Sequence, residues 1–459
     1  MQAHRRPEHL AKTGIAFAGI DLGTSGCRGL ALDENLTALT SVHKAYPLPW
    51  RAQGRSEQDP SLWWEATCEV LQTLQQHLTG HRLVACSVAG TSGSCLLTDQ
   101  AGTPLTPGMM YDDARGQTLA DQLAAGGDHP ASDSRSSLAR LLWLEQQGLP
   151  KEARHFQHQA DWIGGRLCAK PGHSDYHNAL RLGFDANTEC WPDWVLSLVR
   201  HPALLPRVTG PGRPYGPVTP ELARRLGLDP TLEIVAGTTD SIAAFLAAGA
   251  CLEGDAVSSF GSTIALKMLT RQPVQAARYG VYSHRLGDLW LAGGASNAGG
   301  AVLAHYFTAA ELSAYSAHIK PEWPTGLDYY PLLTPGERFP IADPAYQPRL
   351  DPKPANPIDF LHGLLEGLAS IEAQGYRLLA TLGASPLKRI WSSGQTGTNP
   401  ALRALRERLL GQSLRQGPFE DPAAGAALLA AAGSPRPPAQ LWHSWPILGT
   451  LARPIKALH

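Results

Sequence analysis

The stretch of the chain richest in reactive groups covers residues 19–33 and reads GIDLGTSGCRGLALD. Apolar residues alternate on both sides of its glycine-rich centre, which predicts two short strands joined by a tight turn. The turn collects a carboxylate, uncovered backbone N–H groups, two hydroxyls and a positive charge, carried by Asp21, Gly23, Thr24, Ser25, Gly26 and Arg28. This mixture suits a phosphate and its metal ion. A glycine hairpin with Asp21 packed at a strand end is the alternative that this stretch alone leaves open.

A second stretch of the same kind, DAVSSFGSTIALKML, covers residues 255–269. Its turn residues Gly261, Ser262 and Thr263 mirror the Gly-Thr-Ser of the first turn. Two such hairpins, one in each half of the chain, are what a duplicated fold that holds one phosphate chain from both sides would leave in a sequence. Two unrelated glycine hairpins are the alternative.

The carboxylate of Asp240 stands between a predicted strand and an apolar helix, in AGTTDSIAAFLAAGA, residues 236–250. Its local sequence predicts a helix N-cap. The same place allows Asp240 to orient a substrate hydroxyl, because phosphoryl transfer needs an oriented acceptor for the hydroxyl proton more than a strong base. Asp21 would then act through magnesium on the phosphates. The two roles of Asp240 are compatible, and the sequence leaves both open.

A glycine loop between a predicted strand and a leucine-rich helix occurs at residues 388–411, KRIWSSGQTGTNPALRALRERLLG. Gly394 and Gly397 allow a flat ring to approach the backbone, and Asn399 or Pro400 begins the helix. The pattern suits a nucleotide base, and it suits an ordinary turn into a helix equally well.

Polar residues also follow strands in the first half of the chain. AGTSGSCLL, residues 89–97, and MMYDDARG, residues 109–116, present side chains able to bond sugar hydroxyls, namely Thr91, Ser92, Asp112, Asp113 and Arg115. His177 and Asn178 belong to SDYHNALRLGFD, residues 174–185. They can face a cleft, but a hydrogen-bonded structural histidine is the commoner arrangement. Most such residues are loop caps and solvated charges when taken singly.

The elements that must position these residues alternate between helical and strand patterns. Residues 61–78 have helical periodicity, and residues 83–90 are apolar enough for a buried strand, which predicts an α/β fold. A chain of 459 residues exceeds what one hydrophobic core usually serves, so two domains are expected. A Pro/Gly-rich passage at residues 207–220 suggests the division. We expect a disordered arm at residues 1–13 and domains at residues 14–235 and 236–459.

Composition excludes several classes of function. The 39 basic and 40 acidic residues leave a net charge of −1, which offers no electrostatic reason to expect nucleic acid or an anionic membrane as partner. The seven cysteines are odd in number and never form a C-x-x-C pair, which argues against a disulfide framework and a zinc site. A reducing cytoplasm fits this usage. No apolar run is long enough to span a membrane, and the opening residues lack a secretory signal.

Taken in order, these stretches resemble the FGGY family of carbohydrate kinases from about residue 14 onward. The resemblance implies two ribonuclease H-like domains, as in actin and hexokinase, with ATP, Mg²⁺ and a sugar in the interdomain cleft. It also implies that Asp21 is the magnesium-linked carboxylate and Asp240 the catalytic base. The implied phosphate loops are Gly23, Thr24 and Ser25, with Arg28, and Gly261, Ser262 and Thr263. The implied adenosine residues are Gly394, Gln395 and Asn399, and the implied sugar residues are Asp21, Thr91, Ser92 and Asp240.

Within that family the chain looks most like the D-ribulose kinases of cyanobacteria and plants. Seven ordered stretches carry this likeness: AGTSGSCLL, SDYHNALRLGF, AGTTDSIAAFLAAGA, GVYSH, GGASNAGG, GLDYYPL and GERFPIADP. The implied reaction is the ATP-dependent conversion of D-ribulose to D-ribulose 5-phosphate. The alternatives are a kinase for D-xylulose, L-ribulose or a polyol, and an actin-like nucleotide clamp with little transfer activity. The clamp is suggested by the adenosine loop, Gly394 to Asn399, which reads Gly-Gln-Thr-Gly-Thr-Asn where the family usually has Gly-Gly-Gly-Ala-Lys-Asn.

Overall fold

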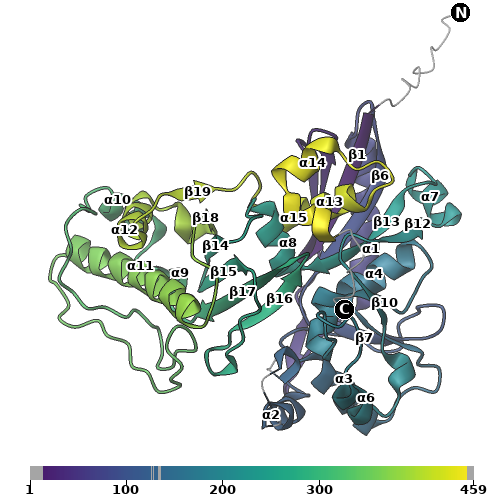
Figure 1. Ribbon diagram of the computed structural model, residues 1–459, viewed down its shortest axis with the longest axis horizontal. Coiled ribbons are helices and arrows are strands. Elements are labelled where there is room, and N and C mark those ends of the chain that lie inside the picture. The colour runs from purple at the N-terminus through teal and green to yellow at the C-terminus, as the bar shows by residue number, and fades with distance from the viewer. Residues whose placement is uncertain (1–13, 126, 128, 133–135, 452–459) are drawn as a thin grey trace, which may run out of the picture.

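The computed structural model of the protein describes residues 14–125, 127, 129–132 and 136–451. The chain forms two lobes that lie side by side, each built on a twisted sheet (Figure 1). The arm expected at residues 1–13 lies outside the described residues. In the part of the chain that the structure describes, no helix has the length and apolar character needed to cross a membrane.

The first lobe contains a six-stranded sheet in the order β12-β13-β6-β1-β2-β3. Its strands are β1 (Gly14–Leu22), β2 (Gly26–Asp33), β3 (Ala38–Ala45), β6 (His81–Gly90), β12 (Pro214–Pro217) and β13 (Glu233–Thr239). The central strands β1, β6 and β13 run parallel, and β2 and β3 are antiparallel to their neighbours. Strands β1 and β6 are buried on both faces, which explains why both read as nearly continuous apolar runs.

The second lobe repeats this arrangement. Its sheet has the order β16-β17-β15-β14-β18-β19. The strands are β14 (Asp255–Phe260), β15 (Ile264–Thr270), β16 (Tyr282–Leu286), β17 (Leu289–Ser296), β18 (Arg389–Ser393) and β19 (Leu414–Gln416). Strands β17, β15 and β14 are antiparallel in succession, as β3, β2 and β1 are in the first lobe. Strands β14, β18 and β19 are parallel, as β1, β6 and β13 are in the first lobe. The two glycine hairpins therefore occupy equivalent places, β1–β2 and β14–β15, in a duplicated fold.

Helices and a small sheet complete the first lobe. The helices are α1 (Pro60–His77), α2 (Gln117–Ala125), α3 (Ser137–Gln147), α4 (Gln159–Leu167), α5 (Tyr176–Ala179), α6 (Asp193–Leu198), α7 (Pro220–Leu226) and α8 (Asp240–Ala247). The small sheet joins β4 (Trp50–Ala52), β5 (Arg55–Gln58), β8 (Gly108–Met109), β7 (Cys95–Thr98) and β9 (His155–His158), and β10 (His173–Asp175) pairs with β11 (Arg207–Thr209). Helix α1 confirms the helix expected at residues 61–78; Asp59 caps it, and Pro60 occupies its first turn.

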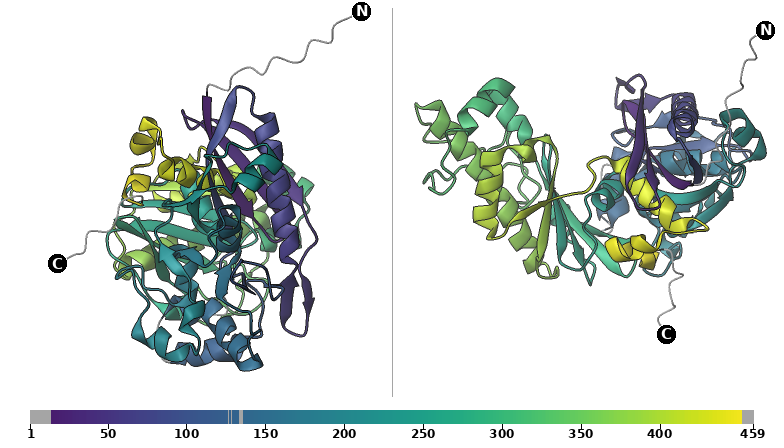
Figure 2. Two further views of the ribbon diagram at one scale, coloured as in Figure 1. Left: turned by 90° about the vertical axis from the view of Figure 1, so that its right-hand side faces the viewer. Right: turned by 90° about the horizontal axis from the view of Figure 1, so that it is seen from above.

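The remaining helices come after β17 in the chain: α9 (Gly300–Tyr306), α10 (Ala309–Ser316), α11 (Pro357–Thr381), α12 (Pro400–Leu410), α13 (Pro422–Gly433), α14 (Ala439–Ser444) and α15 (Pro446–Leu451). Helices α9 to α12 stay with the second lobe, whereas α13 returns to the first and lies beside β1 and β6 (Figures 1 and 2). A Cβ atom added to Gly19 of β1 would lie 1.9 Å from the carbonyl oxygen of Ala423, so glycine permits this close packing. One hydrophobic cluster runs from β1 through α8 and α13 into the second sheet, and the lobes therefore share part of their core.

The end of the first sheet lies later than the sequence indicated. Strand β13 pairs with β6 as far as Thr239, so the division expected after residue 235 falls inside a strand of the first sheet. The Pro/Gly-rich passage at residues 207–220 contains β11 and β12 and ends at the first residue of α7, inside the first lobe. A break in local composition marks a loop, but which sheet the next strand joins depends on pairing with β6, far away in the sequence.

Candidate active site

The carboxyl ends of three parallel strands bring the predicted carboxylates together. Asp21 of β1 and Thr238 of β13 both lie opposite Ala89 of β6, on its two sides. Two strand spacings separate their backbones by about 10 Å. Asp240 follows β13 directly, so both carboxylates lie at the edge of the sheet where ligands bind in open α/β folds.

Asp21 is a buried carboxylate with incomplete hydrogen bonding. It is 3% exposed; Oδ2 lies 3.8 Å from Nη1 of Arg28, and Oδ1 has no hydrogen-bond partner among the described residues. Burial, followed by the negative charges of Asp240 and Asp421, raises the pKa of Asp21 to about 7, against the opposing effect of Arg28. A buried oxygen without a partner is costly, and a cation beside it would relieve that cost.

Asp240 lies one residue further into its helix than the sequence predicted. Thr239 is the N-cap of α8 and makes no side-chain capping bond, whereas Asp240 is the first helical residue. Its Oδ1 accepts a hydrogen bond of 2.6 Å from the backbone N–H of Ser241. Lys267 reaches across from β15 and donates to the carbonyl oxygen of Ser241 at 2.5 Å, which ties the start of α8 to the second sheet.

A third carboxylate, Asp421, belongs to this group and was missed from the sequence. It is the N-cap of α13, where Oδ1 accepts a 2.9 Å hydrogen bond from the N–H of Ala423, and its charge acts on Asp21. An Asp-Pro pair before an alanine-rich segment predicts only a helix start. The signal for its second role lies in the packing of α13 on β1, which no local pattern contains.

The two glycine turns present polar groups at exposed tips. In the first turn the N–H of Gly23 donates to the carbonyl oxygen of Gly26 at 2.9 Å, and Ser25 is exposed. In the second turn the N–H of Gly261 donates to the carbonyl oxygen of Thr263 at 3.1 Å, and Ser262 is exposed. The side chain of Arg28 is half-exposed beside the first turn. Thr24 and Thr263 are partly buried.

The predicted adenosine loop packs directly against the second turn. Gly394 has a φ of +86°, and a Cβ atom there would lie 2.5 Å from the carbonyl oxygen of Phe260, so only glycine fits. Asn399 is the N-cap of α12: its Oδ1 accepts from the N–H of Leu402 at 3.0 Å, and its Nδ2 donates to Oγ of Ser316 at 2.7 Å. Gln395 is exposed. The side chain of Asn399 is thus committed to holding the loop.

A buried ion pair between α12 and α11 lies next to this loop. Nε and Nη2 of Arg406 on α12 lie 2.7 and 2.8 Å from the carboxylate of Glu372 on α11, and Nη1 donates to Oγ of Ser392 at 2.6 Å. The guanidinium also lies 4.1 Å from the ring centroid of Phe260, the residue before the second turn. Bidentate geometry of this kind fixes position as well as charge.

On the first-lobe side, Thr91 supports its loop. Its Oγ1 donates to Oε1 of Gln159 at 2.8 Å and lies 2.6 Å from Oγ of Ser94. Because a carboxamide oxygen only accepts, the hydroxyl proton of Thr91 is committed to Gln159. The next residue, Ser92, is partly exposed at the end of β6. Ser92 is therefore better placed than Thr91 to meet a ligand.

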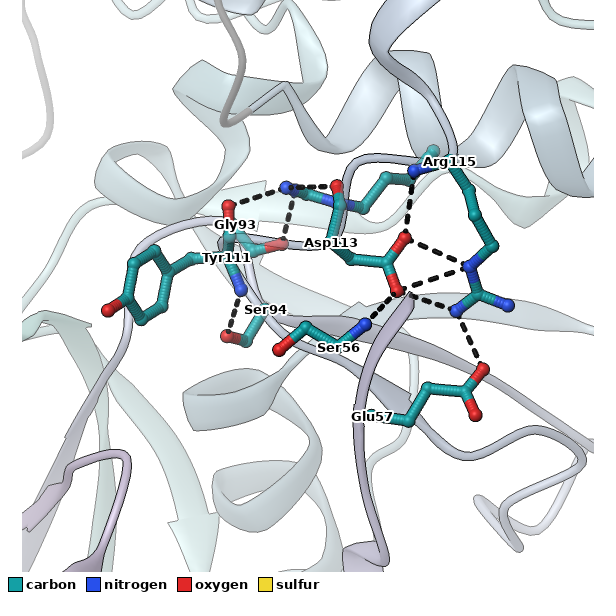
Figure 3. A network of polar contacts seen from close by, with 8 residues as sticks. Ser56, Glu57, Gly93, Ser94, Tyr111, Asp113 and Arg115 are labelled. Atoms are coloured by element: carbon teal, nitrogen blue, oxygen red, sulfur yellow. Dashed lines mark hydrogen bonds and ion pairs between the residues drawn. The ribbon is translucent and has the colours of Figure 1, made fainter. Parts of the chain in front are cut away.

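Within residues 109–116, Asp113 and Arg115 belong to a network of polar contacts, shown in Figure 3. Asp113 is buried, accepts from the N–H of Ser56 at 2.8 Å and pairs with Nη2 of Arg115 at 2.7 Å, and Arg115 also pairs with Glu57 at 2.7 Å. The ring of Tyr111 points away from this network. Asp112 pairs with Arg51 at 3.0 Å. These acids hold loops in place and already have partners.

His177 is the hydrogen-bonded structural histidine that the sequence favoured. It is 1% exposed, and both ring nitrogens have partners, Oγ1 of Thr238 at 2.7 Å and the carbonyl oxygen of Arg285 at 2.6 Å. Asn178 donates to Oδ2 of Asp175 at 2.6 Å.

The residues around Asp21 fit a magnesium ion. Among the described residues no group of three His, Cys, Asp or Glu side chains is arranged to hold a metal by itself. Magnesium bound with a nucleotide needs no such group, because it takes one or two carboxylates together with phosphate oxygens and water. The unpartnered Oδ1 of Asp21 beside a glycine turn supplies one such carboxylate.

Comparison with known proteins assigns each lobe to a domain of one protein family. The N-terminal domain model of the FGGY family of carbohydrate kinases matches residues 16–247, and the C-terminal domain model of the same family matches residues 256–434. The first match ends at residue 247, the last residue of α8, and the second begins at residue 256, in β14.

Among curated proteins, the chain is 25% identical over 256 residues to a xylulose kinase from Staphylococcus xylosus, an alignment that covers 53% of each chain. It is 30% identical over 219 residues to a glycerol kinase from Gloeobacter violaceus, covering 43% of each. The chain thus spans about half the length of these relatives. Among solved structures, a xylulose kinase from Lactobacillus acidophilus has a TM-score of 0.81 at 20% identity, covering 96% of this chain and 93% of that one. The expected pair of ribonuclease H-like domains is confirmed.

Proposed function

Because the chain belongs to the FGGY family of carbohydrate kinases, we propose that it transfers the γ-phosphoryl group of ATP to the terminal hydroxyl of D-ribulose, giving D-ribulose 5-phosphate and ADP. The observation that carries the proposal is the convergence of Asp21 and Asp240 at the carboxyl edge of the first sheet, beside a glycine turn. We also propose that this reaction takes place in the cytoplasm, with a small-molecule sugar and ATP as partners and without nucleic acid or a membrane.

In this proposal the oxygen of the terminal sugar hydroxyl bonds to the γ-phosphorus while the bond from the γ-phosphorus to ADP breaks. The carboxylate of Asp240 accepts the proton that the hydroxyl loses. The N–H groups of Gly23 and Gly261 close the two turns, so the N–H groups of Thr24–Ser25 and Ser262–Thr263, with Arg28, stabilise the phosphate oxygens. Asp21 would hold Mg²⁺, which when bound neutralises charge on the transferring phosphate. Ser92 orients the sugar on the first-lobe side. Gly394 and Gln395 face the adenosine, and Asn399 holds the loop that carries them.

D-Ribulose is proposed as the substrate because seven stretches of the chain resemble the D-ribulose kinases. D-Xylulose is the second candidate, favoured by the names of the relatives, which include xylulose kinases alongside glycerol kinase. The chain lacks the Gln-Met-His that ordinary xylulose kinases carry where Thr91 and Ser92 stand. L-Ribulose and polyols are compatible with the same carboxylates and turns.

The test is ADP release from Mg²⁺–ATP with D-ribulose, D-xylulose, L-ribulose, ribitol and glycerol supplied separately over a no-sugar control. We expect the strongest stimulation with D-ribulose. Stronger stimulation by another sugar would change the proposed substrate and leave the proposed mechanism as it is. ATP binding with no stimulation by any of the five would replace the kinase with a nucleotide clamp.

The base is tested by Asp240→Asn, which keeps the size of the side chain and removes the proton acceptor. We expect kcat to fall by about 10²- to 10⁴-fold, with ATP affinity within about threefold of the parent. Asp193→Asn is the matched control, since Asp193 is also the first residue of a short helix whose N-cap makes no side-chain bond. An Asp240→Asn enzyme with most of its activity would overturn the assignment.

A further inference from the structure

The imidazole of His177 joins three elements that are distant in the sequence. It lies on α5, where Asp175 fixes the backbone by accepting from the N–H groups of His177 at 2.8 Å and Asn178 at 3.1 Å. One ring nitrogen contacts Thr238 of β13, and the other contacts the backbone of Arg285 on β16. The ring therefore connects the first sheet to the second.

These two contacts determine the protonation of the ring. A backbone carbonyl oxygen only accepts, so Nε2 carries the hydrogen that is donated to Arg285. Burial lowers the pKa of His177 to about 4, and the ring is neutral near pH 7. Nδ1 is then an acceptor, and the hydroxyl of Thr238 donates to it at 2.7 Å. Neither hydrogen bond can be reversed while the ring stays neutral.

Thr238 stands two residues before Asp240, in the last part of β13, which leads directly into α8. It is fully buried, whereas the neighbouring Thr239 has a buried Oγ1 that no described residue bonds. The hydroxyl of Thr238 is thus the side-chain anchor at this end of β13. A shift of Thr238 would carry the start of α8 with it.

The partner strand β16 is itself held against the first lobe. Nη1 of Arg285 donates to the carbonyl oxygens of Ala186 at 2.9 Å and Asn187 at 3.3 Å, and Arg181 bonds the hydroxyl of Tyr282 and lies over its ring. These contacts surround the bond from His177 to Arg285. Together these contacts hold β16 against the segment of the first lobe that contains His177.

We propose that His177 is a positioning residue for Asp240, which aligns the base through Thr238 and makes that alignment depend on where β16 of the second lobe lies. The proposal rests on the assignment of Asp240 as the base in the proposed kinase reaction. When the lobes move relative to one another, the ring transmits the position of β16 to the start of α8, where Asp240 lies.

The first test removes one hydroxyl. Thr238→Val keeps the shape of the side chain and deletes the bond to His177. We expect kcat with the best sugar to fall about tenfold, the value of one hydrogen bond, while KM for ATP stays within twofold. Thr98→Val is the matched control, because Thr98 is also a fully buried strand threonine with one side-chain bond, 2.9 Å to Oε1 of Gln157. That control should lose stability without loss of kcat.

The second test separates the two ring nitrogens. The amide nitrogen of His177→Gln can replace Nε2 and keep the bond to Arg285, whereas the amide oxygen of His177→Asn can replace Nδ1 and keep the bond from Thr238. We expect Thr238→Val to cost nothing further in the Gln background and to retain its cost in the Asn background. Where a His177 variant fails to fold, Thr238→Val with its control decides the matter.

The third test asks whether the effect passes through the base. In an Asp240→Asn background, Thr238→Val should leave the residual rate unchanged. If Asp240→Asn abolishes turnover while Thr238→Val lowers only the melting temperature, the positioning role is overturned and the kinase proposal stands. If Asp240→Asn retains turnover, the base assignment falls first. An equal loss of rate from Thr238→Val in both backgrounds would also overturn the positioning role.

Discussion

At the scale of single residues, the surroundings of Asp21 disfavour the ionised form of its carboxylate. It is buried, one of its oxygens has no described partner, and two further carboxylates act on it. Such an arrangement stores destabilisation at a position where a cation or its bound phosphate would cancel it.

Asp21→Asn should therefore stabilise the free protein in a pH-dependent way. The folded pKa of about 7 lies above the ordinary value of 3.8, so ionising Asp21 weakens the folded state as pH rises from about 4 to 7. We expect the free energy of unfolding of the variant to match the parent near pH 4 and to exceed it at pH 8 by up to about 4 kcal/mol. Urea unfolding at both pH values measures this. A difference that is the same at pH 4 and pH 8 would contradict it.

Asp421→Asn should lower the pKa of Asp21, because it removes one of the negative charges that raise that pKa. If turnover needs ionised Asp21, the acid limb of kcat/KM moves to lower pH. The control is Asp59→Asn, since Asp59 is likewise a helix N-cap followed by proline. The measurement is kcat/KM against pH for both variants. An acid limb that shifts equally in the two variants would exclude an effect of Asp421 on the site. An acid limb that does not shift for Asp421→Asn would exclude it as well.

At the scale of elements, α13 positions the carboxylates by lying across both β1 and α8. Its contact with α8 depends on Gly425, where a Cβ atom would lie 1.9 Å from the carbonyl oxygen of Ala243. Backbone atoms cannot yield as a flexible side chain can. The crossing therefore tolerates no side chain at this position.

Gly425→Ala should push α13 away from α8, lower the free energy of unfolding by more than 2 kcal/mol and reduce kcat through displaced Asp421 and Asp240. Gly164→Ala is the control, because Gly164 is also inside a helix and its Cβ would lie an ordinary 3.6 Å from Tyr215. That control should be neutral or slightly stabilising. Thermal unfolding with kcat for both variants tests the crossing; equal stability of the two variants would contradict it.

The parts of the site that could be predicted from sequence are those carried by local patterns. The hairpin at residues 19–33 and its partner at residues 255–269 each contain their turn, flanking strands and polar groups within fifteen residues, and both hairpins are present. Asp240 was also found beside a helix start, displaced by one position from the expected cap.

The rest depends on contacts between residues far apart in the chain. Asp421 reaches the site because α13 packs on β1, and the bond between His177 and Thr238 joins positions 61 residues apart. The assignment of β13 to the first sheet likewise depends on pairing with β6. Local propensity contains none of this information, because register and packing are set by the tertiary structure.

At the scale of the whole molecule, two lobes of the same topology share a core along α8 and α13, and each carries one glycine turn. The proposed transfer needs both turns on one phosphate chain. The lobes must therefore approach one another when ATP and sugar are both bound, which also excludes water.

The radius of gyration should fall when both ligands bind. In Asp240→Asn, ATP, Mg²⁺ and D-ribulose can be added together with little turnover, so small-angle X-ray scattering can follow the closed complex. We expect a smaller radius with both ligands than with either alone. An unchanged radius would show that the lobes do not close on these ligands.

The return of α13 to the first lobe also governs how the protein is made. Strands β1, β2 and β6 are synthesised early, but the helix that covers one face of them ends only at residue 433. A ribosome adds about 5–20 residues per second, so that apolar face stays uncovered for tens of seconds after β6 emerges. The first lobe begins to be translated before the second and is completed only when α13 has been made, and nascent chains of this protein should therefore need chaperone protection until α13 has been translated.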